Sequence, residues 1–330
     1  MNQVVTKLKT MIISENDQTD DGKSNLQSPN EQQPDSSNTH SSYRNQNEIL
    51  ANFFSNLLLI QTIIGFIFKN ENEGKSSHQT HQQIIDYLNT NYKNTNFQKL
   101  REIINWLSSN QTISSSFFLF GYFNYITQTS QGYKKSFDSF NSFINASGKN
   151  HTLARYYVGI CYQYGYGIEK DEKLAFSYYE KIANESHAMG QLKIGQFYEN
   201  GIGIEKDLKM AVYWYEQAAK NENIIALNNL GKCYKDGKGV DIDDNKAFEL
   251  FKKSVKGEHL DGMSNLGYCY YNGIGTNVDK QKAFKLYEKV RKLKSRILSF
   301  DTFLNEVKNI YNAIHSYEKS EENTEISYIN

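Results

Sequence analysis

The sequence has very little proline, and none after residue 34. Its two prolines are Pro29 and Pro34 in a chain of 330 residues. Because proline removes a backbone donor and clashes with the preceding turn, it breaks helices. Nothing beyond residue 34 is therefore barred from helix by proline.

Charge of one sign is also lacking. The chain has 37 basic and 37 acidic residues, so its formal net charge is zero. Nucleic acids and anionic membranes attract chains with an excess of Lys and Arg. The composition therefore predicts neither as a partner.

Cysteine is scarce, and its count of three is odd. An odd number argues against a disulfide framework. The N-terminal stretch Met11–Ile13 is too short for the apolar part of a secretory signal. We therefore expect a cytoplasmic protein.

No apolar run is long enough to span a membrane without interruption. The longest lies in residues 49–69, where Leu57 to Ile60 and Ile63 to Phe68 are separated by polar residues such as Gln61 and Thr62. A span needs about 20 predominantly apolar residues. An amphipathic helix that is buried or binds a partner is the favoured interpretation, and a membrane segment is the alternative.

What the sequence does contain is a repeat of 36 residues, which occurs four times without a gap from residue 151. The blocks start at His151, His187, Asn223 and His259. Each block shows the same columns: a glycine, a tyrosine three residues later, a Gly-X-Gly pair, then Asp, Ala and an aromatic residue. The columns are Gly159, Gly195, Gly231 and Gly267; Tyr162, Tyr198, Tyr234 and Tyr270; Asp171, Asp207, Asp243 and Asp279; Ala175, Ala211, Ala247 and Ala283; and Tyr179, Tyr215, Phe251 and Tyr287.

Each column has a physical explanation. A glycine within a helix costs about 1 kcal/mol relative to alanine, so its recurrence predicts a neighbour too close for a Cβ. The Gly-X-Gly pair ends a first helix, at about 152–164 in the first block, because glycine adopts positive φ cheaply. The Asp is suited to cap a second helix. The small Ala and the aromatic residue four positions later share one face of that helix.

This pattern resembles the Sel1-like repeat, a relative of the tetratricopeptide repeat with a glycine-containing turn. The resemblance covers 144 residues and implies an all-α fold, a right-handed α-solenoid of stacked helix-turn-helix repeats with helical caps. The predicted organisation is residues 1–48 disordered and polar, 49–114 a small helical region, 115–150 a degenerate capping repeat, 151–294 four repeats, and 295–330 a closing helix with a loose tail.

Two flanking details support the caps. Upstream, Phe120, Gly121 and Tyr122 echo the glycine column, and Lys135-Ser136-Phe137 echoes a Lys-Ala-Phe step. Downstream, apolar residues recur at helical spacing, which predicts a closing helix; they are Ile297, Phe300, Phe303, Leu304, Val307, Ile310 and Tyr311. Helices at 81–90 and 97–108 are also expected.

Features that suggest chemistry are explained better by the repeat. The glycine pairs lack the third glycine and the preceding strand of a dinucleotide site, and kinase signatures are absent. Cys161, Cys233 and Cys269 occupy one column that Phe197 also fills, which predicts buried thiols. The histidines that begin three blocks are expected to cap or turn, and the pair His78 and His81 is interpreted as incidental. We expect no catalytic residue, cofactor or metal, and hence no enzyme.

The family resemblance implies a protein-protein interaction scaffold or adaptor, with intracellular signalling as one setting and a protein or peptide as partner. The tetratricopeptide analogy places a binding groove on the concave face of the first helices. Its two central lysines suit a peptide that carries an acidic residue. We expect the protein to be a monomer. The candidate groove residues are Tyr156, Ile160, Gln163, Leu192, Gln196, Glu199, Lys232, Lys235, Asp236, Tyr268 and Tyr271. Alternatives are a membrane-associated quality-control adaptor of the Sel1 type and a Sel1-like hydrolase.

Overall fold

The computed structural model describes residues 36–92, 96–110, 113–128 and 136–298, and every regular element in these ranges is a helix. The chain forms two compact units, Met1–Asn52 and Phe53–Asn330. The first unit contributes only the first part of α2 to the described residues. The helices before the array are α2 (Ser36–Glu73), α3 (Ser77–Asn91), α4 (Asn96–Ser109), α5 (Ser114–Gln128) and α6 (Ser136–Gly148).

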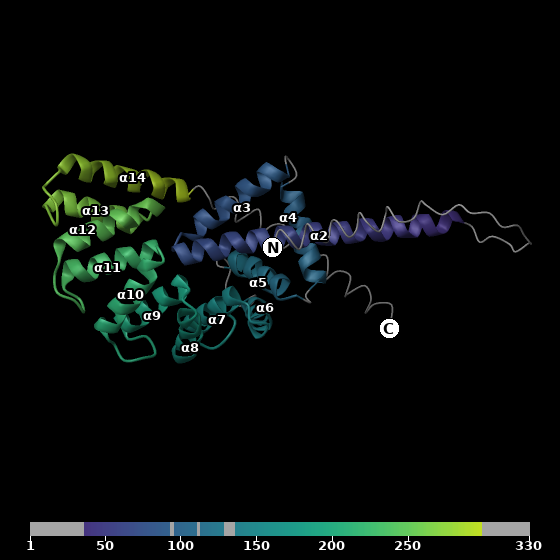
Figure 1. Cartoon of the computed structure of the whole chain (residues 1–330), viewed down its shortest axis with the longest axis horizontal. Coiled ribbons are helices and arrows are strands. Elements are labelled where there is room, and N and C mark those ends of the chain that lie inside the picture. Colours follow the sequence, from purple (N-terminus) through teal and green to yellow (C-terminus); the bar gives the residue numbers. More distant parts are fainter. Residues whose placement is uncertain (1–35, 93–95, 111–112, 129–135, 299–330) are drawn as a thin grey trace, which may run out of the picture. The chain divides into compact units, whose positions relative to one another are not determined.

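The four repeats form eight α-helices that follow one another in space as in sequence (Figure 1). This confirms the predicted all-α solenoid. The first helices of the repeats are α7 (Thr152–Tyr164), α9 (Ala188–Asn200), α11 (Ile224–Asp236) and α13 (Leu260–Asn272). The second helices are α8 (Glu172–Asn184), α10 (Leu208–Lys220), α12 (Asp244–Ser254), which the short 3-10 helix η2 (Val255–Gly257) follows, and α14 (Lys280–Leu298).

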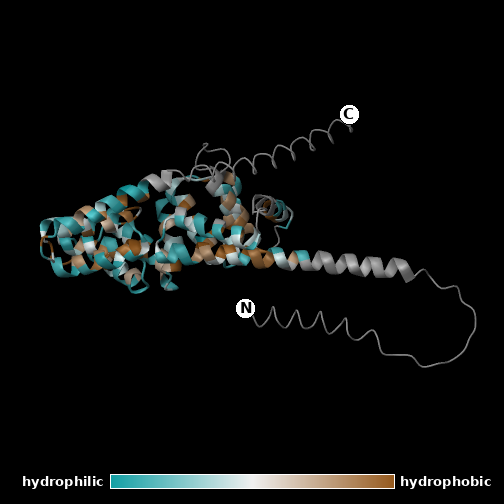
Figure 2. Cartoon of the chain, turned by 90° about the horizontal axis from the view of Figure 1, so that it is seen from above, coloured by the Kyte–Doolittle hydropathy of each residue, from teal (hydrophilic) through white to brown (hydrophobic). Residues whose placement is uncertain are grey.

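Apolar and polar residues alternate along the helices of the array, as expected for amphipathic helices (Figure 2). Each repeat closes on itself through its glycine and its aromatic residue. A Cβ on Gly159 would lie 2.6 Å from the Tyr179 ring, and one on Gly231 would lie 2.7 Å from the Phe251 ring. The predicted close approach is confirmed, and the neighbour is the aromatic side chain of the second helix.

The two glycines of each turn have different tasks. The first, such as Gly201 with φ +69°, ends its helix in the left-handed conformation. The second also has positive φ, but it lies against the preceding repeat: a Cβ on Gly203 would come within 2.7 Å of the Glu172 backbone. The pair therefore both ends a helix and lets one repeat approach the next.

The recurring Asp caps the second helices as predicted. The carboxylate of Asp171 accepts a hydrogen bond from the backbone N–H of Leu174 at 2.9 Å, and the same bond recurs one repeat length later each time. The first helices are capped by the block-initial residues His151, Asn223 and His259, whereas His187 makes no side-chain cap.

One face of the apolar stretch from Leu57 to Phe68 is buried within the second unit. Its residues Leu59, Ile60, Ile63 and Ile67 are at most 1% exposed, and they belong to the same core as the first two repeats. No helix in the described ranges is long and apolar enough to cross a membrane. The interpretation as a buried helix is confirmed. Cys161, Cys233 and Cys269 are likewise buried and free, as predicted from their shared column.

Helices α5 and α6 pair in the same way as a repeat. A Cβ on Gly121 would lie 3.0 Å from the Phe143 ring, which reproduces the contact of Gly159 with Tyr179. The buried Ser139, four residues before Phe143, therefore takes the place of the repeat alanine. The alanine position of this unit is therefore Ser139 and not Ser136, and 22 residues separate Gly121 from Phe143, against 20 between the corresponding residues of each repeat.

The ends of the described chain differ in part from the expectation. Residues 36–48 are helical, although their polar composition predicted disorder. A helix that is already anchored can extend outward because each added residue forms one hydrogen bond without a new nucleus. The last described helix ends at Leu298, so the closing helix expected from Phe300 to Tyr311 lies outside the described residues, as do residues 1–35.

Candidate functional site

The stripe of residues predicted to line a groove divides into a buried half and an open half. In the first two repeats, Tyr156, Ile160, Gln163 and Leu192 are at most 8% exposed. In the last two repeats, Tyr268 and Tyr271 are 47% and 43% exposed. Lys232, Lys235, Gln196 and Glu199 are partly exposed, and Asp236 is exposed. The members of the set that are exposed, rather than partly exposed or buried, therefore lie in the third and fourth repeats.

Two of the predicted groove residues serve the core instead. The hydroxyl of the buried Tyr179 donates a hydrogen bond to Gln163 Oε1 at 3.0 Å. One repeat later, the hydroxyl of Tyr215 donates to the Glu199 carboxylate. Because a buried hydroxyl needs a partner, this column supplies an acceptor for the buried tyrosine in each of the first two repeats.

The third repeat breaks that relationship. Its aromatic residue is Phe251, which has no hydroxyl, and the column position is Lys235. Lys235 is therefore released from the core. Its Nζ lies 3.2 Å from Asp236 and 5.4 Å from the centre of the Tyr268 ring.

The charge of this open half is positive. Asp236 is held by Lys235 and also by Lys238, whose Nζ lies 3.3 Å away. Burial would raise the pKa of Asp236, but the two ammonium groups outweigh burial and hold that pKa below its usual range. Lys232 has no carboxylate within ion-pair distance in the described part of the chain. The set formed by Lys232, Lys235, Lys238 and Asp236 thus has two positive charges in excess.

The buried half is closed by the end of α2. The Tyr157 hydroxyl donates a hydrogen bond of 2.9 Å to Glu71 Oε1, and Tyr156 also interacts with that carboxylate. The Nζ of Lys193 lies 6.0 Å and 5.7 Å from the rings of Tyr156 and Tyr179. Burial raises the pKa of Glu71 above its ordinary value, against the opposing effects of the Tyr157 hydrogen bond and the Lys193 charge.

The same helix and the following turn reach the block-initial column of the array. The Phe68 ring packs edge-on against His187 with centroids 5.3 Å apart. Asn72 accepts a hydrogen bond from Met189 N–H through Oδ1 at 3.3 Å and one from Asn223 Nδ2 through its backbone carbonyl at 2.8 Å. Gln79 at the start of α3 donates to the Gly257 carbonyl at 3.0 Å. The corner between α2 and α3 therefore contacts the second and third blocks.

Sequence reasoning missed this corner. The block-initial residues were interpreted as caps or turn residues, which is correct but incomplete. Their recurrence as His, His, Asn and His, rather than Asp, was the available signal. His81, interpreted as incidental, is also buried and lies 3.1 Å from the Tyr122 hydroxyl, so it holds α3 against α5.

The thiols are not poised for chemistry. Burial raises the pKa of Cys161 to about 12 and those of Cys233 and Cys269 to about 11. A thiol with such a pKa is a poor nucleophile at neutral pH. Within the ranges that the structure describes, no group of three His, Cys, Asp or Glu side chains is arranged to hold a metal ion.

Stacked helix pairs, glycine-closed repeats and an open inner face define the class of α-solenoid repeat proteins, which recognise partners through extended surfaces. Four consecutive segments, residues 152–187, 188–223, 224–259 and 260–290, match the family model described as Sel1 repeat. The array is therefore a run of four Sel1 repeats, a fold that is commonly a protein-interaction scaffold.

Two solved structures are similar to this chain. The protein c5321 of uropathogenic Escherichia coli, a protective antigen described as having an SLR fold, is 22% identical, with a TM-score of 0.52 over 79% of this chain and 56% of that chain. The chain thus spans little more than half of that protein. A Sel1 repeat protein from Oxalobacter formigenes is 25% identical, with a TM-score of 0.49 over 59% of this chain and 80% of that chain. A comparison with curated protein sequences found no match.

Proposed function

We propose that this protein is a non-catalytic interaction scaffold that binds a segment of another protein on the inner face of its third and fourth repeats. The observation that carries the proposal is the released Lys235 beside exposed aromatic residues. In the first two repeats the same position is tied to a core tyrosine, and Tyr156, Ile160 and Leu192 beside it are buried. In the last two repeats it is open.

The chemistry of this face indicates the kind of partner. Lys232 and Lys235 supply positive charge, and Tyr268 and Tyr271 supply flat amphipathic surfaces. Tyrosine is among the residues that dominate the binding energy of many interfaces, and lysines complement acidic partners and select against basic ones. A peptide with an acidic residue next to an apolar or aromatic one would complement both features.

The proposal includes a cytoplasmic, monomeric adaptor with a place in intracellular signalling. Three reduced cysteines fit a reducing compartment. The alternative of a membrane-associated quality-control adaptor required residues 49–68 to insert into a bilayer. Their burial in the protein core disfavours it.

A peptide display experiment with the full chain tests the proposed face. Immobilised protein should enrich peptides that pair Asp or Glu with an apolar residue. Lys232→Glu combined with Lys235→Glu should weaken binding of the enriched peptides by about tenfold, since exposed charge pairs contribute up to about 1 kcal/mol each.

The matched control reverses two lysines on second helices, Lys209→Glu and Lys285→Glu, which are exposed in the structure. This variant keeps the same net charge change and should bind the peptides as the wild type does. Equal loss in both variants would show that only overall charge matters, and no loss in either would overturn the proposed face.

A further inference from the structure

The two helices of each repeat are capped by different residue types. The second helices all begin after Asp, whereas the first helices begin after His, His, Asn and His. A carboxylate is the common cap because it accepts hydrogen bonds and favours the positive end of the helix dipole. It has no proton to donate, however. His and Asn can accept with one atom and donate with another.

Asn223 shows that the second atom is used. Its Oδ1 accepts the hydrogen bond from Ala226 N–H at 2.9 Å, which caps α11, and its Nδ2 donates to the carbonyl of Asn72 at 2.8 Å. The Asn223 side chain is fully buried between the two segments. At this position, therefore, a cap residue also recognises the backbone of another segment.

The neighbouring block-initial residues also have partners before the array. His151 stacks on Phe118 with ring centroids 4.8 Å apart, and His187 contacts Phe68. His259 is the exception. Its Nδ1 accepts the capping bond from Gly262 N–H at 3.1 Å, so the ring proton is on Nε2. No hydrogen-bond partner for Nε2 is present in the described part of the chain.

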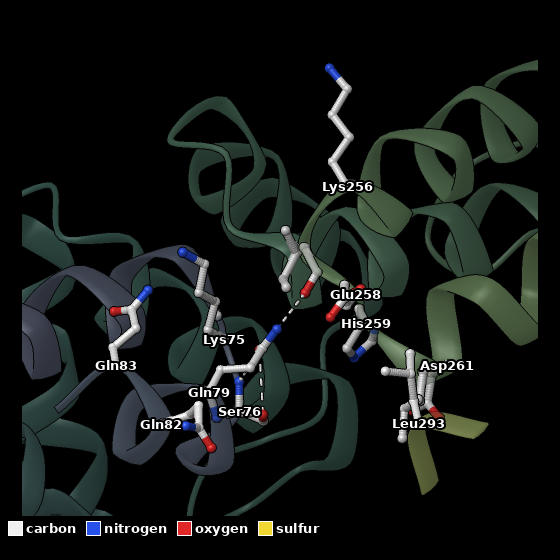
Figure 3. Close-up of a pocket in the computed structure, with 14 residues that line it drawn as sticks. Lys75, Ser76, Gln79, Gln82, Gln83, Lys256, Glu258, His259, Asp261 and Leu293 are labelled. Atoms are coloured by element: carbon white, nitrogen blue, oxygen red, sulfur yellow. Dashed lines mark hydrogen bonds between the residues drawn. The ribbon is translucent and has the colours of Figure 1, made fainter. Parts of the chain in front are cut away.

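His259 lies on the wall of a pocket of about 540 Å³ between the α2–α3 corner and the fourth block. Figure 3 shows Ser76, Gln79 and Gln82 on one side of this space and His259, Asp261 and Leu293 on the other. Its volume is in the range of small-ligand sites.

The lining is mixed and carries no net charge. Two lysines, Lys75 and Lys256, balance Glu258 and Asp261, and burial lowers the pKa of His259, which keeps the ring neutral at pH 7. Lys75 is already paired with Glu73, and Glu258 with Lys289. The apolar part of the wall consists of Ile224, Leu260 and Leu293.

A second donor faces the same space from α3. Gln83 accepts a hydrogen bond from Asn70 through Oε1 at 3.0 Å, which leaves its Nε2 to donate. Gln82 donates to Asp86 at 2.8 Å, which leaves its Oε1 to accept. Donors and an acceptor around an apolar wall match the groups of a peptide backbone flanking an apolar side chain.

We propose that this pocket is a second binding site, independent of the inner face of the third and fourth repeats, for a short uncharged stretch of another polypeptide. A backbone carbonyl of that stretch accepts the hydrogen bond from His259 Nε2, as Asn72 accepts one from Asn223. An apolar side chain of the same stretch packs against Ile224, Leu260 and Leu293.

The test uses the full chain and the tripeptide acetyl-Ala-Leu-Ala-amide as probe, with saturation-transfer NMR as readout. The wild type should bind it, and acetyl-Ala-Ser-Ala-amide, which lacks the apolar side chain, should bind at least several-fold more weakly. His259→Asn keeps both the cap and the donor and should bind like the wild type. His259→Asp keeps the cap only, and its affinity should fall about threefold to tenfold.

Both variants should have the melting temperature of the wild type, measured by circular dichroism, since Asn and Asp are good caps. An absent signal for the leucine peptide with the wild type would overturn the proposal. Equal affinity of the wild type for the two peptides would also overturn it, and that comparison does not depend on the folding of a variant. Undiminished binding of the leucine peptide by His259→Asp would overturn it as well.

Discussion

Asn223 holds Asn72, a residue 151 positions earlier in the chain, by a hydrogen bond of 2.8 Å from its Nδ2 to the Asn72 carbonyl. The bond joins the third repeat to the end of α2. Gly74, two residues further on, lies so close that a Cβ there would come within 2.7 Å of Asn223 Oδ1. The Asn223 side chain thus packs as closely against the α2–α3 corner as against its own helix, α11.

Asn223→Asp should detach the corner while keeping the cap of α11. The carboxylate can still accept from Ala226 N–H, but it cannot donate to Asn72 and would place a buried charge beside a carbonyl oxygen. We expect a loss of about 2–4 kcal/mol. Hydrogen exchange should show faster exchange of amides in residues 68–83. Asp207→Asn makes the reverse substitution at an exposed second-helix cap. It should leave hydrogen exchange in residues 68–83 unchanged and alter stability by no more than about 0.5 kcal/mol.

Gly195→Ala should destabilise the second repeat. A Cβ there would lie 2.6 Å from the Tyr215 ring, and that ring is fully buried and cannot move aside. We expect a loss of about 3 kcal/mol, at the upper end of overpacking costs. Gly65→Ala is the matched control, because nothing lies within 4 Å of a Cβ at this position in α2. There alanine should stabilise the helix by up to about 1 kcal/mol. Denaturant unfolding measures the free energy of unfolding of both variants. A change of the same sign in both would contradict the close approach of the Tyr215 ring to Gly195.

Glu71 should make the docking of α2 depend on pH. Its folded-state pKa is raised by burial, so its contribution to stability is greatest below its unfolded pKa of 4.5 and is lost as the pH rises through the folded value. Glu71→Gln keeps an acceptor for Tyr157 without the charge. As the pH rises from acidic to mildly alkaline values, the wild type should therefore lose stability relative to the variant. Urea unfolding of both proteins at pH 5 and pH 8 measures this difference, and a difference that does not change with pH would contradict the argument.

Much of the fold could be predicted because the same contacts within a repeat recur four times. Gly195 and Tyr215 are 20 residues apart, within one repeat, and so are the corresponding pairs in the other blocks. Contacts of such short range recur with the period and become visible when the chain is aligned with itself. The Asp caps and buried cysteines follow in the same way.

The candidate groove could be predicted only in part. The column that contains Gln163, Glu199 and Lys235 was identified, but its two roles were not separated. Gln163 and Glu199 accept a hydrogen bond from a buried tyrosine of the second helix, whereas Lys235 stands opposite Phe251, which has no hydroxyl. The sequence does contain this difference, because Phe251 replaces tyrosine in the same repeat in which Lys235 replaces a hydrogen-bond acceptor.

By itself, the sequence determined the repeat, its helix pair, its caps and its turns, because these depend on neighbours within 36 residues that recur at a fixed period. Only the tertiary structure decided which half of the inner face stays open. That outcome depends on α2, whose Glu71 and Asn72 meet residues of the array that are 86 and 151 positions away. Such a contact occurs once and has no period, so nothing in the repeated columns could reveal it.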